Sequence, residues 1–268
     1  MKNYNNFYVS CEIRGPGVEN AGLGNQLFCI ATTIAYSLKY NKIATFPEIM
    51  TNLGVNKYLN VFYKNLNTLP FGDIHNVYTE KSFSFDAIPG YSGNVFLKGY
   101  FQSEKYFVEY REEILKALDI NRNIKQVREK YKDYSDYTSI HVRRGDYLKL
   151  SEFHTNLSMD YYKSAVANFS DKEKFLIFSD DIEWCKDNLN FLDNIEFSPC
   201  NKDYEDLILM STCKNNIMAN SSFSWWAAWI NNNKEKLVIY PENWFGIRNR
   251  HMSTDTLCPL QWKKIKKD

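Results

Sequence analysis

The chain of 268 residues has no long hydrophobic run. No window approaches the roughly 18 apolar residues that a membrane-spanning helix needs, and the start, MKNYNNFYVS, lacks the apolar core of a signal peptide. Six cysteines, at positions 11, 29, 185, 200, 213 and 258, form no Cys-x-x-Cys pair and no Cys–His spacing typical of zinc. These absences predict a soluble, cytoplasmic protein with reduced cysteines.

Excess charge is also missing, because 33 Lys and Arg residues face 32 Asp and Glu residues, for a net charge of +1. Nucleic-acid binding needs a basic face or stripe, so this balance argues against it. The phosphates of any partner must then be met by a few local residues. A hydrophobic content of 44% over this length is enough for two modest domains, each with its own core.

The most informative segment present is His141–Tyr147, which reads HVRRGDY and directly follows the apolar run Tyr137–Ile140. It places two arginines and a carboxylate where a strand ends, and open α/β sheets bind ligands at such ends. Arg143 and Arg144 offer fixed forks of donors that match a phosphoryl or pyrophosphate group. Asp146 would act as a base or hold the arginines in place. The alternative is a structural turn of ion pairs.

A second segment, Asn220–Trp229, reads NSSFSWWAAW and follows a strand-like run at 216–219. Ser221 and Ser222 would begin a helix, where unpaired N–H groups and about half a unit of dipole charge favour an anion. Simple N-capping by these serines is the alternative. Three tryptophans share one helix face and are expected in the core: Trp225, Trp226 and Trp229.

A third segment, AGLGNQLF, lies between the strand-like stretch Asn6–Ile13 and a helix-like stretch that ends near Tyr40. It is not a dinucleotide fingerprint, because Leu27 stands where a third glycine is needed. Gly22 and Gly24 would still present bare backbone amides to an anion, although a tight strand-to-helix turn explains them as well. The preceding loop, 15–21, looks like an insertion and leaves the role of both glycines open.

Taken together, GLGNQLF, HVRRGDY and SSFSWWAAW resemble, in this order and spacing, the α-1,2-fucosyltransferases of glycosyltransferase family 11, in their bacterial or viral form. The similarity runs from about Gly22 to Phe245. It implies an inverting, metal-independent enzyme of the GT-B type, with two Rossmann-like domains. It also implies transfer of L-fucose from GDP-fucose to the 2-hydroxyl of a terminal galactose, on an oligosaccharide or a surface polysaccharide, without a further cofactor.

The resemblance also implies roles for individual residues. Arg144 matches the second arginine of the family motif and would stabilise the charge that grows on the departing diphosphate. His141 and Asp180 would face the nucleoside, although Asp180 with Glu183 also reads as a helix capping box. The remaining substrate-binding residues are Gly22, Gly24, Asn25, Gln26, Arg143, Ser221, Ser222 and Phe223.

The identity of a catalytic base stays open among Asp146, Glu152 and His154. The chain has no Asp-x-Asp motif, and the adjacent Asp180 and Asp181 are expected to point apart, so no metal site is predicted. A different class of function also stays open, namely a non-catalytic nucleotide-sugar or glycan-binding protein of the same fold. Contact of the lysine-rich tail with a membrane surface is possible in principle, but a solvated terminus is expected.

The second half alternates strand and helix, which predicts a parallel sheet with helices on both faces. Strands are expected near 137–142, 174–179, 194–198, 215–219 and 236–240, and helices near 158–169, 181–189, 203–213 and 222–232. The first half is less regular, with a stretch rich in Tyr, Phe and Asn at 46–103 and helices near 103–118 and 121–136. We expect an acceptor-side α/β domain at 1–132 and a GDP-fucose-binding domain at 133–268.

Overall fold

A computed structural model describes residues 7–13 and 22–266, and the chain divides into two compact units. Unit 1 runs to Asn123 and also includes Ser253–Cys258; unit 2 contains Ile124–Met252 and the chain from Pro259 on. The division therefore falls nine residues before the expected boundary at 132, inside helix α5 (Ile120–Lys130).

Hydrogen bonds explain where this division falls. In the first turn of α5, Arg122 Nη2 donates to the carbonyl of Asn60 at 2.9 Å, while at its end Lys130 Nζ lies 2.6 Å from Glu205 Oε1. Residues 253–258 return to unit 1 because Ser103 Oγ donates to the carbonyl of Thr256 at 2.5 Å. The first residues of α5 thus belong to unit 1, and the rest of the helix belongs to unit 2.

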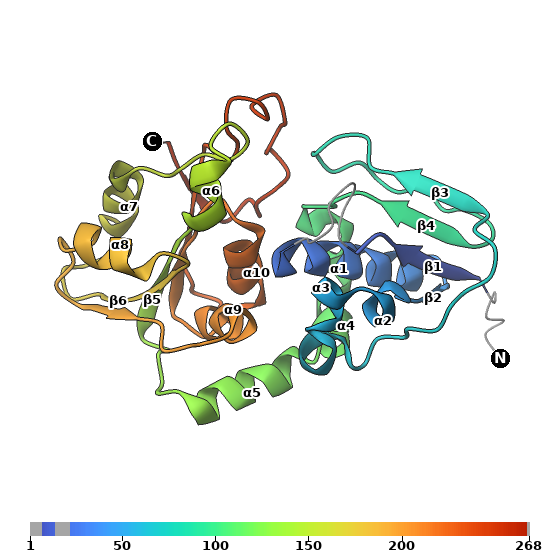
Figure 1. Ribbon diagram of the computed structural model, residues 1–268, viewed down its shortest axis with the longest axis horizontal. Coiled ribbons are helices and arrows are strands. Elements are labelled where there is room, and N and C mark those ends of the chain that lie inside the picture. Colours follow the sequence, from blue (N-terminus) through green and yellow to red (C-terminus); the bar gives the residue numbers. More distant parts are fainter. Residues whose placement is uncertain (1–6, 14–21, 267–268) are drawn as a thin grey trace. The chain divides into compact units, whose positions relative to one another are not determined.

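Unit 1 contains a parallel sheet of four strands in the order β2-β1-β4-β3 (Figure 1). Helix α1 packs against β1 and β2 and is buried along most of its length. The bounds are β1 (Tyr8–Cys11), α1 (Leu23–Lys39), β2 (Ile43–Ala44), α2 (Glu48–Thr51), α3 (Leu53–Asn56), the π-helical turn η1 (Leu59–Tyr63), β3 (Asn76–Thr79), β4 (Val95–Lys98), the 3-10 turns η2 (Glu104–Tyr106) and η3 (Val108–Tyr110), and α4 (Arg111–Ala117).

Strands β3 and β4 lie inside the stretch 46–103, for which the sequence indicated no strand. Each has four residues, too few for a clear alternating pattern. In β3 only Tyr78 is buried, so the strand carries almost no hydrophobic signal of its own.

Unit 2 contains a six-stranded parallel sheet in the order β10-β9-β8-β5-β6-β7. Helices α7 and α8 pack on one of its faces and α9 and α10 lie on the other (Figure 1). The strands are β5 (Tyr137–Val142), β6 (Lys174–Ser179), β7 (Ile195–Phe197), β8 (Asn215–Ile217), β9 (Val238–Pro241) and β10 (Lys263–Ile265); the helices are α6 (Gly145–Lys149), α7 (Met159–Val166), α8 (Ile182–Asn188), α9 (Asp203–Ser211) and α10 (Ser222–Ile230).

The expected strands and helices of this half are confirmed within a few residues, with two additions. Helix α6 is a short turn inside the HVRRGDY region. The lysine-rich tail is not a solvated terminus, because residues 263–265 pair with β9 in parallel register as strand β10. Its lysine side chains are exposed while its backbone completes the sheet, which is how edge strands are commonly built.

Alternate residues of the strands in unit 2 point to one face of its sheet and form part of the hydrophobic core. Ile140, Val142 and Ile177 are fully or almost fully buried there against Tyr161 of α7 and Cys185 of α8. On the opposite face, Trp225, Trp226 and Trp229 are at most 4% exposed, which confirms the expected role of the tryptophans as core residues.

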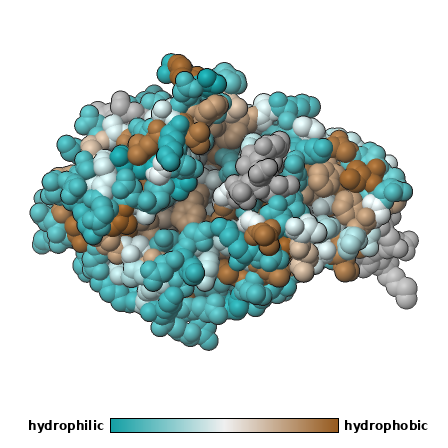
Figure 2. Space-filling view, viewed as in Figure 1, coloured by the Kyte–Doolittle hydropathy of each residue, from teal (hydrophilic) through white to brown (hydrophobic). Residues whose placement is uncertain are grey.

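None of the helices in the described part of the chain is long and apolar enough to cross a membrane. The surface in Figure 2 is mainly hydrophilic on the face that it shows, with smaller hydrophobic areas between the polar ones.

Candidate active site

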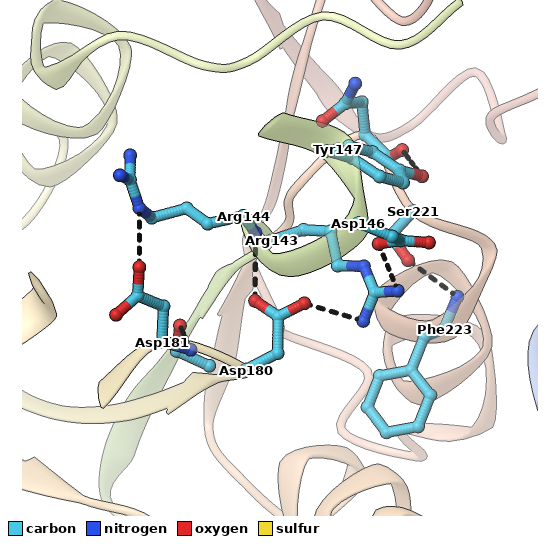
Figure 3. A network of polar contacts seen from close by, with 10 residues as sticks. Arg143, Arg144, Asp146, Tyr147, Asp180, Asp181, Ser221 and Phe223 are labelled. Atoms are coloured by element: carbon cyan, nitrogen blue, oxygen red, sulfur yellow. Dashed lines mark hydrogen bonds and ion pairs between the residues drawn. The ribbon is translucent and has the colours of Figure 1, made fainter. Parts of the chain in front are cut away.

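The strand order of unit 2 gathers the predicted motifs at one edge of its sheet. From β5 the chain continues through β6 to β7, and then returns to the other side of β5 with β8. The order therefore reverses between β5 and β8, and ligands of open α/β sheets bind at the carboxyl ends of strands at such a reversal. The HVRRGDY loop follows β5, Asp180 and Asp181 follow β6, and Ser221 follows β8 (Figure 3).

Arg143 is held between two carboxylates of different loops. Its Nη2 lies 2.6 Å from Asp146 Oδ1, and its Nη1 lies 2.9 Å from Asp180 Oδ2 (Figure 3). Its guanidinium also lies 5.4 Å from the ring centre of Tyr147. These contacts fix its side chain between the end of β6 and the first turn of α6.

Arg144 is fixed by both its backbone and its side chain. Its backbone N–H donates to Asp180 Oδ1 at 2.9 Å, and its Nε donates to Asp181 Oδ2 at 3.0 Å. The guanidinium lies 3.9 Å from the ring centre of Trp184, a distance at which a cation and an aromatic face attract each other. Among the described residues no group accepts a hydrogen bond from its two Nη atoms.

Gly145 is required by the close approach of Asp180. A Cβ atom at this position would lie 2.6 Å from Asp180 Oδ2 and 3.1 Å from its carboxyl carbon. Because Asp180 bonds both Arg143 and Arg144, a side chain at Gly145 would disturb the contacts of both arginines. The glycine of HVRRGDY therefore allows the two loops to pack together.

The two adjacent aspartates bind different arginines, Asp180 mainly Arg143 and Asp181 the side chain of Arg144. The capping-box interpretation of Asp180 is wrong, since α8 is capped by Asp181, whose Oδ1 accepts from Trp184 N at 3.3 Å. The network thus contains two guanidinium groups and three carboxylates. The arginines are preorganised by carboxylates and do not form the unpaired positive site that the motif alone suggested.

The helix α10 begins at this edge. Ser221 is its N-cap, and its Oγ accepts from Phe223 N at 3.3 Å, so N-capping by this serine is confirmed. Ser222 is the first residue of the helix, and Ser222 and Phe223 are partly exposed. The positive end of the α10 dipole therefore lies at the same sheet edge as the arginine pair.

His141 is near the end of β5, two residues before Arg143. It is 5% exposed, and its ring centre lies 5.5 Å from that of Phe223. Burial, together with the charge of Arg143, lowers its pKa to about 3, although the charge of Asp180 opposes this shift. Its buried Nδ1 has no hydrogen-bond partner among the described residues, so a neutral imidazole nitrogen remains available beside the network.

Tyr147 is a further residue of this site, and it connects the loop after β8 with the segment after α6. Its role was not predicted from the sequence. Its hydroxyl donates to the carbonyl of Asn220 at 3.1 Å, and its ring stacks on His154 with centres 4.2 Å apart at 8°. Burial raises the pKa of Tyr147 to about 12. The available signal was its place at the end of the HVRRGDY motif, where an aromatic residue completes the first turn of α6.

Glu152, one of the predicted bases, is engaged elsewhere. Its carboxylate lies 2.8 Å from Arg248 Nε on the surface, and its carbonyl accepts from Arg248 N at 2.8 Å. His154 is nearer to the network, because it stacks on Tyr147 and both Asp146 and Arg143 influence its pKa, which burial lowers.

The residues of the GLGNQ segment belong to unit 1. Gly22 is the N-cap of α1 with φ −60°, and no described atom lies within 4 Å of a Cβ placed there, so neither backbone nor space requires glycine. Gly24 lies in the first turn of α1. Gln26 is fully buried, where it accepts from the Tyr63 hydroxyl at 2.9 Å and donates to the carbonyl of Gly54.

Asn25 is the member of this segment with a polar partner at the sheet edge, since its Oδ1 accepts from Gln102 Nε2 at 2.9 Å. The insertion-like loop before Gly22 lies outside the described residues. In the described part of the chain no group of three or more His, Cys, Asp or Glu side chains is arranged to hold a metal ion.

The fold defines the class of protein. The chain matches the fucosyltransferase NodZ from Bradyrhizobium with a TM-score of 0.51 at 13% identity, over 83% of this chain and 91% of that one. NodZ α-1,6-fucosyltransferase co-crystallized with GDP gives 0.51 at 12% identity over the same shares. The two parallel α/β units therefore have the GT-B type of fold, which confirms the predicted fold class.

Sequence comparison identifies the family. The model of glycosyl transferase family 11 matches residues 60–262, which is more than half of the chain. The chain belongs to glycosyltransferase family 11, and the resemblance seen in its three motifs is confirmed.

Curated relatives include both bacterial and animal proteins. The O-antigen biosynthesis glycosyltransferase WbnK of Escherichia coli is 35% identical over 174 residues, 59% of this chain and 58% of the relative. An α-1,2-colitosyltransferase of Escherichia coli is 35% identical over 188 residues, 65% and 64%. Galactoside α-(1,2)-fucosyltransferase 2 of Mus musculus is 27% identical over 234 residues, 78% and 65%. The chain spans about three fifths of the length of these relatives.

Proposed function

We propose that this chain is an inverting, metal-independent α-1,2-fucosyltransferase that transfers L-fucose from GDP-fucose to the 2-hydroxyl of a terminal galactose. Family membership and the animal α-(1,2)-fucosyltransferase relative support the reaction. The bacterial O-antigen relative supports a surface polysaccharide as the acceptor. The observation that carries the proposal is the pair Arg143 and Arg144, held by carboxylates at the switch point of a parallel sheet.

The donor would bind at the edge formed by β5, β6 and β8. The free Nη donors of Arg144 and the N-terminus of α10 at Ser221 suit a diphosphate, because both present N–H groups to an anion. The neutral His141 beside Phe223, together with Asp180, supports a nucleoside site. This assignment follows the rule that a carboxylate at the end of the neighbouring strand binds the ribose of a nucleotide.

In the proposed reaction an oxygen of the acceptor attacks the anomeric carbon of fucose from the face opposite to the diphosphate. The bond between that carbon and the diphosphate oxygen breaks, and GDP leaves with the electron pair. Arg144 would stabilise the charge that grows on the leaving oxygens, and donors already in place cost no reorganisation during the reaction. The carboxylates of Asp180 and Asp181 hold the guanidinium and the backbone of Arg144 for this purpose.

The proton of the acceptor hydroxyl must pass to a base or to solvent. Asp146 is our candidate, because its side chain is half exposed and its contact with Arg143 fixes one oxygen. His154 is the alternative, since its ring stacks on Tyr147 and its buried Nδ1 has no partner among the described residues. The surface ion pair of Glu152 with Arg248 makes Glu152 the weakest of the three candidates.

The relatives suggest a second candidate for the sugar nucleotide that serves as donor substrate. One bacterial relative is an α-1,2-colitosyltransferase at 35% identity, so transfer of colitose from its nucleotide-activated form is a specific alternative. Both reactions would use the same arginine pair. They differ in the sugar that is transferred, fucose or colitose.

The test is release of GDP from GDP-fucose, with chelator present throughout, with and without a panel of terminal galactosides such as lactose. Release stimulated by a galactoside supports the fucosyltransferase, and product linkage and anomeric configuration are then read by NMR. Turnover only with the activated colitose would change the donor. Activity that requires added metal would contradict the metal-independent mechanism, and silence with every donor would favour a non-catalytic binding protein. A cytoplasmic location stays a prediction.

A further inference from the structure

The sheet of unit 1 has its own reversal of strand order. From β1 the chain passes through α1 to β2 on one side, while β3 and β4 lie on the other side of β1. The carboxyl end of β4 and the first turn of α1 therefore belong to the switch point of this sheet, where parallel sheets bind ligands. Polar residues at this edge include Glu80 after β3, Gln102 after β4 and Asn25 in α1, and Glu48 after β2 accepts from Ile13 N after β1.

Glu80 holds the segment that follows β4. Its carboxylate accepts from Tyr100 N at 2.7 Å and from Phe101 N at 3.1 Å, and the hydroxyl of Tyr106 lies 3.4 Å from it. The segment lies so close that a Cβ at Gly99 would stand 2.5 Å from the Cβ of Glu80. Carboxylates that accept backbone N–H groups form strong, charge-assisted bonds, so this side chain fixes the path of the backbone.

That path includes a strained residue. Phe101 has φ 52°, in the left-handed region that is unfavourable for a bulky residue. It is fully buried between Tyr78 and Tyr106, with ring centres 6.3 Å and 5.4 Å away. Strain of this kind persists only where the surroundings impose it, and it is concentrated at functional positions.

The next residue shows what the strained turn achieves. Gln102 is 7% exposed, and its Nε2 donates to Asn25 Oδ1 at 2.9 Å, which joins residues 77 positions apart. In the part of the chain that the structure describes, Gln102 Oε1 receives no hydrogen bond. An almost buried amide oxygen thus remains available as an acceptor, held in one orientation by the bond to Asn25.

We propose that Glu80 is a positioning residue, which holds the strained turn at Phe101 so that the Gln102 amide, oriented by its bond to Asn25, presents its oxygen to a hydroxyl group of the acceptor glycan. This inference rests on the proposed function. The available oxygen of Gln102 accepts hydrogen bonds, which a sugar hydroxyl can donate and a diphosphate cannot.

The test compares Glu80→Gln and Gln102→Leu, alone and combined. We expect Glu80→Gln to lower kcat/KM for the acceptor about tenfold, since small displacements of a positioning contact cost up to about 100-fold. Donor hydrolysis without acceptor and the Kd of GDP should stay within about twofold. In the Gln102→Leu background the same change should have almost no further effect, because residues that act through one contact are not additive.

Glu205→Gln is the matched control. Glu205 is a buried carboxylate of unit 2 that bonds Lys130 and Tyr131, so this variant reports the effect of removing such a charge elsewhere. The inference alone is overturned if wild type turns over but Glu80→Gln leaves the acceptor parameters unchanged, changes donor and acceptor parameters equally, or keeps its full effect beside Gln102→Leu. A wild-type chain that is silent with every donor and galactoside overturns the proposed function and this inference with it.

Discussion

The two sheets present their carboxyl edges in different chemical forms. The edge of unit 2 carries Arg143 and Arg144 with three aspartates, and its bonds join side chains of different loops. The edge of unit 1 carries the amides of Asn25 and Gln102, and its carboxylates, Glu48 and Glu80, accept from backbone N–H groups. The same parallel-sheet geometry thus supports a network of ion pairs in one unit and amides with backbone-bonded carboxylates in the other. The loops after the strands decide which ligand each edge suits.

The largest effect on activity is expected when the charge of Arg144 is removed. Arg144→Ala should lower kcat about 10²–10³-fold, as for loss of one preorganised donor to a developing anion. Arg128→Ala is the control, because it removes the same charge from an exposed position of α5. Steady-state kinetics with GDP-fucose and a galactoside measure both, and circular dichroism checks the fold. Equal losses in the two variants would show that only net charge matters.

Two glycines give the next contrast between the edges. Gly145→Ala places a Cβ 2.6 Å from Asp180 Oδ2, and overpacking of this kind costs about 1–3 kcal/mol of stability. Because Asp180 must shift away from both arginines to relieve it, GDP binding should weaken by up to about 150-fold. Gly22→Ala meets no described atom within 4 Å and should change the Kd of GDP less than about twofold. Isothermal titration calorimetry with GDP measures both. The comparison fails if alanine is equally tolerated at the two positions.

His141 links the charged edge to stability. Burial depresses its folded pKa to about 3 from an unfolded value of about 6.5, so its neutral form stabilises the fold above pH 6.5. That contribution is lost as the pH falls from about 6.5 towards 3 and should amount to about 2 kcal/mol lost by pH 5. Urea unfolding at pH 7 and pH 5 should show a smaller loss in His141→Phe than in wild type.

His251→Phe serves as the control for this pH dependence, because His251 is exposed. It should lose the same stability as wild type between pH 7 and pH 5. If His141→Phe also keeps the full loss, other groups dominate acid unfolding and the buried neutral histidine has no measurable role in it.

The smallest effect is expected for Glu152→Gln. Exposed ion pairs are worth at most about 1 kcal/mol, and Glu152 and Arg248 are both about 60% exposed, so stability and kcat should change little. The identical substitution at Glu80 should lower acceptor kcat/KM while sparing the donor. A large drop in kcat for Glu152→Gln, with a changed pH profile, would instead restore Glu152 as the base.

Much of unit 2 could be predicted from its sequence, because β6 and β9 are mainly apolar runs and the motifs begin at the end of a strand or shortly after one. The pairing of Asp180 and Asp181 with the arginines could not, since it depends on β6 lying next to β5 in the sheet. In unit 1 the strands β3 and β4 have four residues each, too few for a clear alternating pattern. The bond between Gln102 and Asn25 joins distant positions through a strained turn that no local residue preference indicates.

Strand β10 has a practical consequence for handling the protein. It is an edge strand of three residues, and it covers β9, whose Val238, Ile239 and Pro241 are buried. Removing residues 263–268 would leave the backbone of β9 unpaired along an apolar edge, which is a template for joining a second molecule. A shortened chain is therefore expected to aggregate when it is concentrated. In the full chain, the exposed lysines of β10 disfavour pairing of this edge with a second molecule.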